Sequence, residues 1–223
     1  MSEKKQTEHY KEIWVNKFDE DSVNRFRHDI MAITTIDPNI PIPIYIDSYG
    51  GYVDSLIKMI DTIDSLTNPI ITIVMGKAFS CGSILASCGD HRFCTPNSRI
   101  MIHEVSAGAF GTVNDINITA KETDRINKQI MTLLAKNCGY KDMKEIKQRM
   151  IELAGDNADL YLTAKQSVEF GIVDEVGVPK INAMMIYECV NPPPIPKQVR
   201  KQRAQQILNM VIVEKQPKKK GKK

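Results

Sequence analysis

Two residues of the sequence, Ser80 and His103, have the types and positions that nucleophilic catalysis requires. Ser80 follows an apolar segment that ends at Gly76, and it opens a stretch of small residues, so its hydroxyl is expected at a strand end. A serine hydroxyl attacks only when a base removes its proton and backbone N–H groups hold the oxyanion. His103 ends a second apolar segment, and strand ends are where α/β sheets present functional groups. Taken singly, each residue has a commoner explanation. Ser80 could be an ordinary helix N-cap, and His103 could be a core histidine that bonds a backbone group.

The turn Ser48-Tyr-Gly-Gly51 follows a third predicted strand, and its backbone could contact a ligand there. Its glycines allow close approach of the main chain, and they equally suit a tight turn with positive φ. The N–H of Cys81, at the start of the helix after Ser80, could add a second donor for negative charge. Phe79-Ser-Cys-Gly82 lacks the G-x-S-x-G pattern of hydrolase elbows, so the local sequence suggests a nucleophilic serine but does not identify one.

Cys88, His91 and Cys94 are spaced C-x2-H-x2-C and could supply three zinc ligands. A fourth ligand is missing nearby, because Cys81 and His103 lie some distance away in sequence. We therefore expect packed thiols beside a surface histidine, with no metal and no cofactor. Five cysteines in a chain that can fold without disulfides indicate a reducing, cytoplasmic setting.

The segments around these residues alternate between strand and helix patterns. Apolar runs typical of buried strands occupy residues 44–46, 70–75 (broken by Gly76), 92–94 and 99–103, and Ile172-Val173 reads as a further strand. Helical patterns begin after Asp21, at an Asp54 N-cap and near Ser80, cover Val113–Lys136 and Asp142–Leu153, and run from a Thr163–Gln166 capping box to Gly171. This alternation predicts an α/β fold with a mainly parallel sheet buried on both faces.

Length and composition fit one folded domain with a tail. The chain has 223 residues, of which 42% are hydrophobic, and its net charge of +3 is too small for a disordered protein. No apolar run approaches the roughly 18 residues of a membrane span, and the polar start lacks the apolar stretch of a secretory signal. We expect a flexible segment over residues 1–12, one domain over 13–190, and a Pro-rich linker with a basic tail over 191–223.

Charge divides between the body and the tail of the chain. From Lys197 onward, ten Lys/Arg and one acid give +9, whereas the remainder has 20 Lys/Arg against 26 Asp/Glu, or −6. The tail lacks interleaved aromatic residues, so we expect a solvated terminus rather than a nucleic-acid-binding element.

Beyond these local patterns, separate segments resemble, in order and approximate spacing, the proteolytic subunit of Clp protease. They are Ser48–Gly51, Gly76–Gly82, Arg92–His103 and Ala164–Asp174. Matching segments in order over about residues 12–180 are far more specific than any single one. The resemblance implies a ClpP/crotonase-like fold of repeated strand-strand-helix units with a protruding handle helix, for which Val113–Lys136 is the candidate.

The same resemblance implies a role for each site residue. Ser80 corresponds to the nucleophile, His103 to the general base and Asp159 to the acid that orients the histidine. The N–H groups of Gly51 and Cys81 correspond to the oxyanion hole. Asp156 is the nearest alternative for the acid.

Four departures from the family pattern limit what the resemblance implies. The usual Ser-Pro-Gly-Gly contains Tyr49 in place of proline, and Glu104-Val105 replaces Gln-Pro after the histidine. Asn157-Ala158 replaces a Glu-Arg pair that is linked to contacts between stacked rings. The N-terminal segment that touches the unfoldase in the family is reduced to about a dozen polar residues.

The predicted function is a serine endopeptidase that cleaves unfolded polypeptides inside a self-compartmentalising ring, through an acyl-enzyme. The resemblance implies a ring of seven subunits, with a stacked double ring and an AAA+ unfoldase as further expectations; a phage-type maturation protease is a variant. Two alternatives stay open. One is a catalytically silent ring subunit with an assembly role, and the other is a crotonase-type enzyme acting on acyl-CoA.

Overall fold

The computed structural model describes residues 12–36, 40–155 and 159–177 as an α/β structure. Its strands are β1 (Ile13–Val15), β2 (Ile42–Ser48), β3 (Ile70–Phe79), β4 (His91–Cys94), β5 (Arg99–Ile102), β6 (Leu160–Thr163) and β7 (Glu175–Val176). Its helices are α1 (Glu20–Ile36), α2 (Val53–Asp64), α3 (Cys81–Ala86), α4 (Val113–Cys138), α5 (Met143–Ala154) and α6 (Ala164–Phe170). The predicted linker and tail lie outside the described residues.

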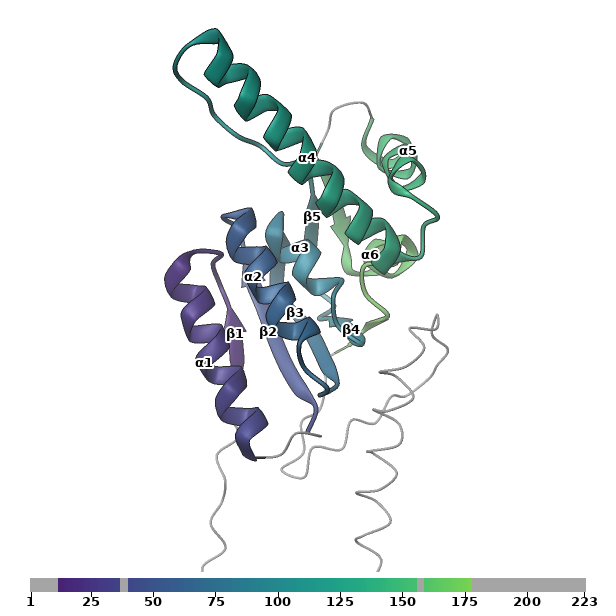
Figure 1. Ribbon diagram of the computed structural model, residues 1–223. Helices are drawn as coiled ribbons and strands as arrows, with labels where there is room; N and C mark the ends of the chain where they lie inside the picture. Colours follow the sequence, from purple (N-terminus) through teal and green to yellow (C-terminus); the bar gives the residue numbers. More distant parts are fainter. Residues whose placement is uncertain (1–11, 37–39, 156–158, 178–223) are drawn as a thin grey trace, which may run out of the picture.

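The strands form one mainly parallel sheet. Strands β1, β2, β3, β4 and β7 lie side by side in that order and run parallel. Strand β5 pairs in parallel with the end of β3, and β6 runs antiparallel to β5. Helices α1, α2 and α3 lie over one face of the sheet (Figure 1). The predicted α/β fold with a mainly parallel sheet is therefore confirmed.

Alternating side chains of the strands enter apolar clusters on the two faces of the sheet. Ile44 and Ile46 of β2 belong to the large core beneath the helices, whereas Tyr45 between them joins a smaller cluster on the other face. That smaller cluster includes Ile71, Ile73 and Phe93. Successive side chains of a strand point to opposite faces of the sheet, and here both faces carry an apolar cluster. The strands therefore appear as continuous apolar runs in the sequence.

Strand β3 continues through Gly76, so the predicted break there is wrong. Gly76 has φ of 91°, and the register between β2 and β3 shifts at this point, which marks a β-bulge. Before the bulge β3 pairs with β4, and after it Lys77–Phe79 pairs with β5. The bulge thus brings the end of β3 beside the end of β5.

Helix α4 projects away from the sheet and its covering helices (Figure 1). Its C-terminal half is buried through residues such as Ile130 and Leu134, whereas Val113 and Ile118 near its start are exposed. A Thr112–Asp115 capping box begins it and Gly139, with φ of 84°, ends it. This geometry matches the protruding handle helix that was predicted.

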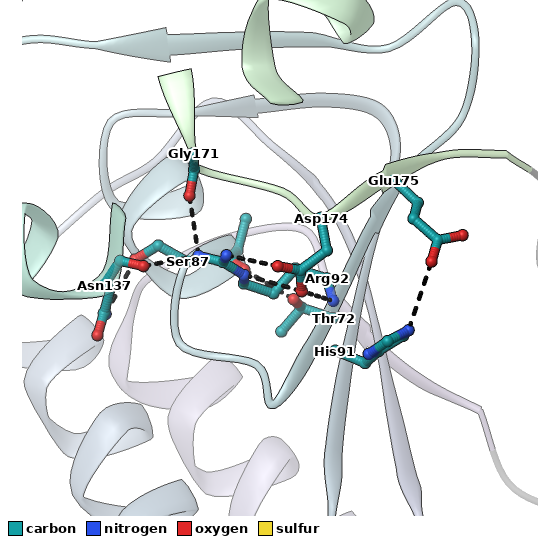
Figure 2. A network of polar contacts seen from close by, with 9 residues as sticks. Thr72, Ser87, His91, Arg92, Asn137, Gly171, Asp174 and Glu175 are labelled. Atoms are coloured by element: carbon teal, nitrogen blue, oxygen red, sulfur yellow. Dashed lines mark hydrogen bonds and ion pairs between the residues drawn. The ribbon is translucent and has the colours of Figure 1, made fainter. Parts of the chain in front are cut away.

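A buried ion pair joins Arg92 of β4 to Asp174, which lies just before β7 (Figure 2). Arg92 Nη2 lies 2.6 Å from Asp174 Oδ1, and Arg92 Nε donates to Asp174 Oδ2 at 3.1 Å. Arg92 Nη1 also donates to the carbonyl oxygens of Asn137 in α4 and Gly171 after α6, each at 2.9 Å. One side chain therefore satisfies the carbonyls at the ends of two helices.

Two local predictions need correction. Helix α2 begins after Tyr52, without a side-chain cap, so Asp54 lies in its first turn. Residues 172–173 are not a strand, because β7 begins two residues later at Glu175. In contrast, the Thr163–Gln166 capping box and the Gly171 helix end are confirmed. None of the helices in the described ranges is long and apolar enough to cross a membrane.

Candidate active site

Ser80 lies at the junction of β3 and α3 in a backbone conformation that is unusual for a residue with a side chain. Its φ of 54° and ψ of −121° make it the only non-glycine residue with positive φ in the described ranges. Its N–H donates to the Met101 carbonyl at 2.9 Å, and its carbonyl accepts from the Ser83 N–H at 2.9 Å. Strained backbone of this kind costs of order 1–3 kcal/mol and occurs preferentially at functional sites.

The Ser80 hydroxyl contacts His103 rather than capping α3. Ser80 occupies the N-cap position, but its side chain makes no cap hydrogen bond. Instead its Oγ lies 2.7 Å from His103 Nε2. His103 follows β5, which the bulged end of β3 brings alongside Ser80. The N-cap explanation for Ser80 and the backbone-partner explanation for His103 are both replaced by this contact, which is the geometry of a hydroxyl beside a general base.

Asp159 lies directly before β6, opposite the end of β5. The antiparallel pairing of β5 with β6 ends at Ile102 and Leu160, and His103 and Asp159 are the next residues beyond this last pair. The Asp159 side chain is exposed, and within the described ranges no hydrogen bond joins it to His103. Asp156, the alternative acid, lies outside the described residues.

The turn after β2 packs Gly50 directly against Ser80, whereas Gly51 packs against Phe18. A Cβ atom at Gly50, whose φ is 101°, would lie 2.8 Å from Ser80 Cβ and 3.2 Å from Ser80 Oγ. The Gly50 N–H donates to Ser48 Oγ at 3.0 Å, and the neighbouring Tyr52 N–H donates to the Phe18 carbonyl at 2.8 Å. A side chain at position 50 would therefore displace the serine, which explains a glycine there.

A hydrogen bond joins Cys81 to Gly51 beside Ser80. Cys81 Sγ donates to the Gly51 carbonyl at 3.2 Å. Burial raises the pKa of the Cys81 thiol, so near neutral pH it stays protonated and keeps this donor. The Cys81 N–H belongs to the first turn of α3, where N–H groups have no partner within the helix.

A pocket beside Ser80 and His103 is lined by both apolar and polar residues. Its apolar side chains are Val53, Leu56, Ile84, Val105 and Ile130, and Glu104 and Ser106 add polar groups. A hydroxyl, an imidazole and nearby backbone donors beside such a pocket suit an acyl-transfer reaction.

Three polar residues beside the pocket form a group that the sequence did not predict. Glu104 of the pocket forms an ion pair with Lys147 of α5, and these contacts hold the pKa of the Glu104 carboxyl below its usual value. Asn127 of α4 accepts a hydrogen bond from the Val105 N–H at 3.1 Å and also bonds the Glu104 side chain. No spacing in the sequence could reveal this group, because its members come from three separate elements.

The cysteines and histidine that could have formed a zinc site have other partners. Cys88 Sγ donates to the Ile84 carbonyl, and Cys94 Sγ contacts the Ala164 carbonyl at 3.8 Å. His91 Nε2 lies 3.8 Å from Glu175. Over the described part of the chain, no group of three His, Cys, Asp or Glu residues could hold a metal ion.

Comparison with known proteins identifies one family. The family model described as Clp protease matches residues 9–180. Two relatives from strains of Bacteroides fragilis, each named ATP-dependent Clp protease proteolytic subunit, are 32% identical over 166 residues. These alignments cover 74% of this chain and 77% and 72% of the respective relatives.

Proposed function

The chain belongs to the Clp protease family, and from that membership we propose that it is a serine endopeptidase acting through Ser80. The observation that carries the proposal is the 2.7 Å contact between Ser80 Oγ and His103 Nε2. His103 takes the proton as Ser80 attacks the scissile carbonyl carbon, and it returns the proton to the leaving amine. The resulting acyl-enzyme is then hydrolysed by water, which His103 activates in the same way.

The oxyanion of each tetrahedral intermediate is assigned to the N–H groups of Gly51 and Cys81. Both residues line the pocket beside Ser80, one from the glycine turn and one from the start of α3. The thiol of Cys81 bonds the Gly51 carbonyl, so the two donor-bearing segments are tied to each other. Removing one oxyanion donor typically costs about 3–4 kcal/mol of transition-state stabilisation.

The experiment that tests this proposal is labelling with a fluorophosphonate probe, which reacts with activated serine hydroxyls. Wild-type protein is expected to take up one label per chain, and Ser80→Ala none. Replacement of Ser83, the next hydroxyl along α3, by alanine should leave the label in place. Persistent labelling of Ser80→Ala would show that the reactive residue has been assigned wrongly.

Asp159 is proposed as the acid that orients His103 and stabilises its protonated form. Asp159→Asn should lower kcat about 10⁴-fold, because an amide favours the wrong imidazole tautomer and carries no compensating charge. Steady-state hydrolysis of a fluorogenic peptide measures the effect. Asp156→Asn is the matched control and should retain activity near the wild-type level; the reverse pattern would move the acid role to Asp156.

We propose that the protein works as a homo-oligomeric ring, in keeping with its family. The projecting end of α4 and the loop before it expose Phe110 (97%), Val113 (77%) and Ile118 (57%). Exposed apolar side chains gathered in one region mark contact surfaces. Native mass measurement is expected to give seven or fourteen times the 25.2 kDa chain mass, whereas monomers alone would contradict the ring.

The proposed substrates are unfolded polypeptides, since a ring admits chains only through its openings. The relatives' name, ATP-dependent Clp protease proteolytic subunit, fits an AAA+ unfoldase as partner for folded substrates. We also propose a cytoplasmic location, because none of the described cysteines forms a disulfide. The chemistry proposed requires no metal or cofactor.

A further inference from the structure

Three aromatic side chains form a row across the strands that carry the candidate site. The rings of Tyr49 and Phe79 meet edge to face with centroids 5.8 Å apart, and those of Phe79 and Tyr161 do so at 5.7 Å. Phe79 is almost fully buried, whereas Tyr49 is 75% exposed. Alternation along the strands places this aromatic row on the face of the sheet opposite the helices.

Basic side chains contact two of the three rings, Tyr49 at one end of the row and Phe79 in its middle. Lys77 Nζ lies 4.2 Å from the ring centroid of Tyr49 and 2.7 Å from Asp47 Oδ1. The guanidinium of Arg99 lies 5.8 Å from the centroid of Phe79. A cation over an aromatic face is attracted by the ring quadrupole, so the exposed ring of Tyr49 is held in one place.

Each residue of the row is close in sequence to a site residue. Tyr49 directly precedes Gly50, which packs against Ser80. Phe79 directly precedes Ser80, and Tyr161 lies two residues after Asp159. Position 49 is where the family usually has proline, which fixes φ. Tyrosine leaves φ free, so the contacts of the Tyr49 ring add to the backbone hydrogen bonds of Gly50 and Tyr52 in holding this turn.

We propose that Tyr49 is a positioning residue, which holds the glycine turn against Ser80 through its contacts with Lys77 and Phe79. The inference rests on the proposed peptidase function. When the ring is removed, Gly50 and Gly51 can move away from Ser80, and the Gly51 N–H no longer stays where the oxyanion forms. Tyr49 itself lies on the far side of the sheet from the helices and acts only through this turn.

The test compares Tyr49→Ala, Tyr49→Phe and wild type in fluorophosphonate labelling and peptide hydrolysis. Loss of an aromatic pair and a cation–π contact should lower both the labelling rate and kcat about tenfold. KM should change less than about twofold, because the lost interaction is one that stabilises the transition state. Tyr49→Phe keeps the ring and should stay close to wild type.

Trp14→Ala is the matched control, since it removes a partly exposed ring that stacks on Tyr45 at 4.9 Å on strand β1, away from Ser80. It should leave the labelling rate unchanged. If wild-type protein takes up the label and Tyr49→Ala takes it up at the same rate, the inference about Tyr49 fails while the proposed function stands. An effect of Tyr49→Ala on KM alone would also overturn the inference, because Tyr49 would then be a substrate contact. A wild-type protein that takes no label would overturn the proposed function and the inference with it.

Discussion

Replacing Ser80 by glycine is expected to abolish catalysis and yet to give a more stable protein than replacing it by alanine. Both variants lack the nucleophile, so kcat for peptide hydrolysis should fall about 10⁶-fold, with residual activity from oxyanion binding. They differ in the backbone, because φ of 54° and ψ of −121° are disfavoured for any residue with a Cβ atom. Glycine adopts this conformation without steric cost.

The expected stability difference is about 1 kcal/mol in favour of Ser80→Gly. Relief of strain contributes about 1–3 kcal/mol, and the greater loss of backbone entropy by glycine offsets about 0.5–1 kcal/mol of it. Urea unfolding of the two variants at equal protein concentration measures the difference. Ser80→Ala retains the Cβ atom and is therefore the control for loss of the hydroxyl. Equal stability would mean that the site holds no strain in its backbone.

The general architecture could be predicted from the sequence because its strands and helix ends have local causes. Apolar runs at 44–46 and 99–103 and the capping residues Thr163 and Gln166 act within a few positions of the chain. The predicted strand break at Gly76 was wrong because the effect of this glycine is not decided locally. A positive-φ glycine ends a strand or forms a bulge depending on which strands pair beside it, and only the tertiary structure supplies β5 as the partner after the bulge.

The candidate site was predictable in part, for a related reason. Ser80 and His103 each stand at the end of an apolar segment, so their position at a sheet edge could be predicted, although their contact could not. The link from Glu104 to Lys147 and the cation over Tyr49 depend on side chains that come together only through folding. Neither contact produces a recognisable spacing in the sequence, because the partners belong to different elements.

Arg92→Met is expected to cause the largest loss of stability among the substitutions considered. The side chains of Arg92 and Asp174 are only 5% and 8% exposed. Removing the guanidinium takes its hydrogen bonds from the buried Asp174 carboxylate, which keeps the backbone N–H of residue 92, and from the carbonyls of Asn137 and Gly171. Breaking a buried ion pair in this way costs about 3–5 kcal/mol. Urea unfolding followed by the fluorescence of Trp14, the single tryptophan, measures the loss.

Lys128→Met is the matched control, because it breaks an ion pair of the same 2.6 Å length with Asp124 in which both side chains are more than half exposed. Its cost should stay below about 1 kcal/mol, since exposed pairs are screened by water. The double variant Arg92→Met with Asp174→Leu removes both buried charges and should be clearly more stable than Arg92→Met alone. If it is not, the penalty arises from the carbonyls of Asn137 and Gly171 rather than from loss of the guanidinium beside the Asp174 carboxylate, and Arg92 serves chiefly to join the two helix ends.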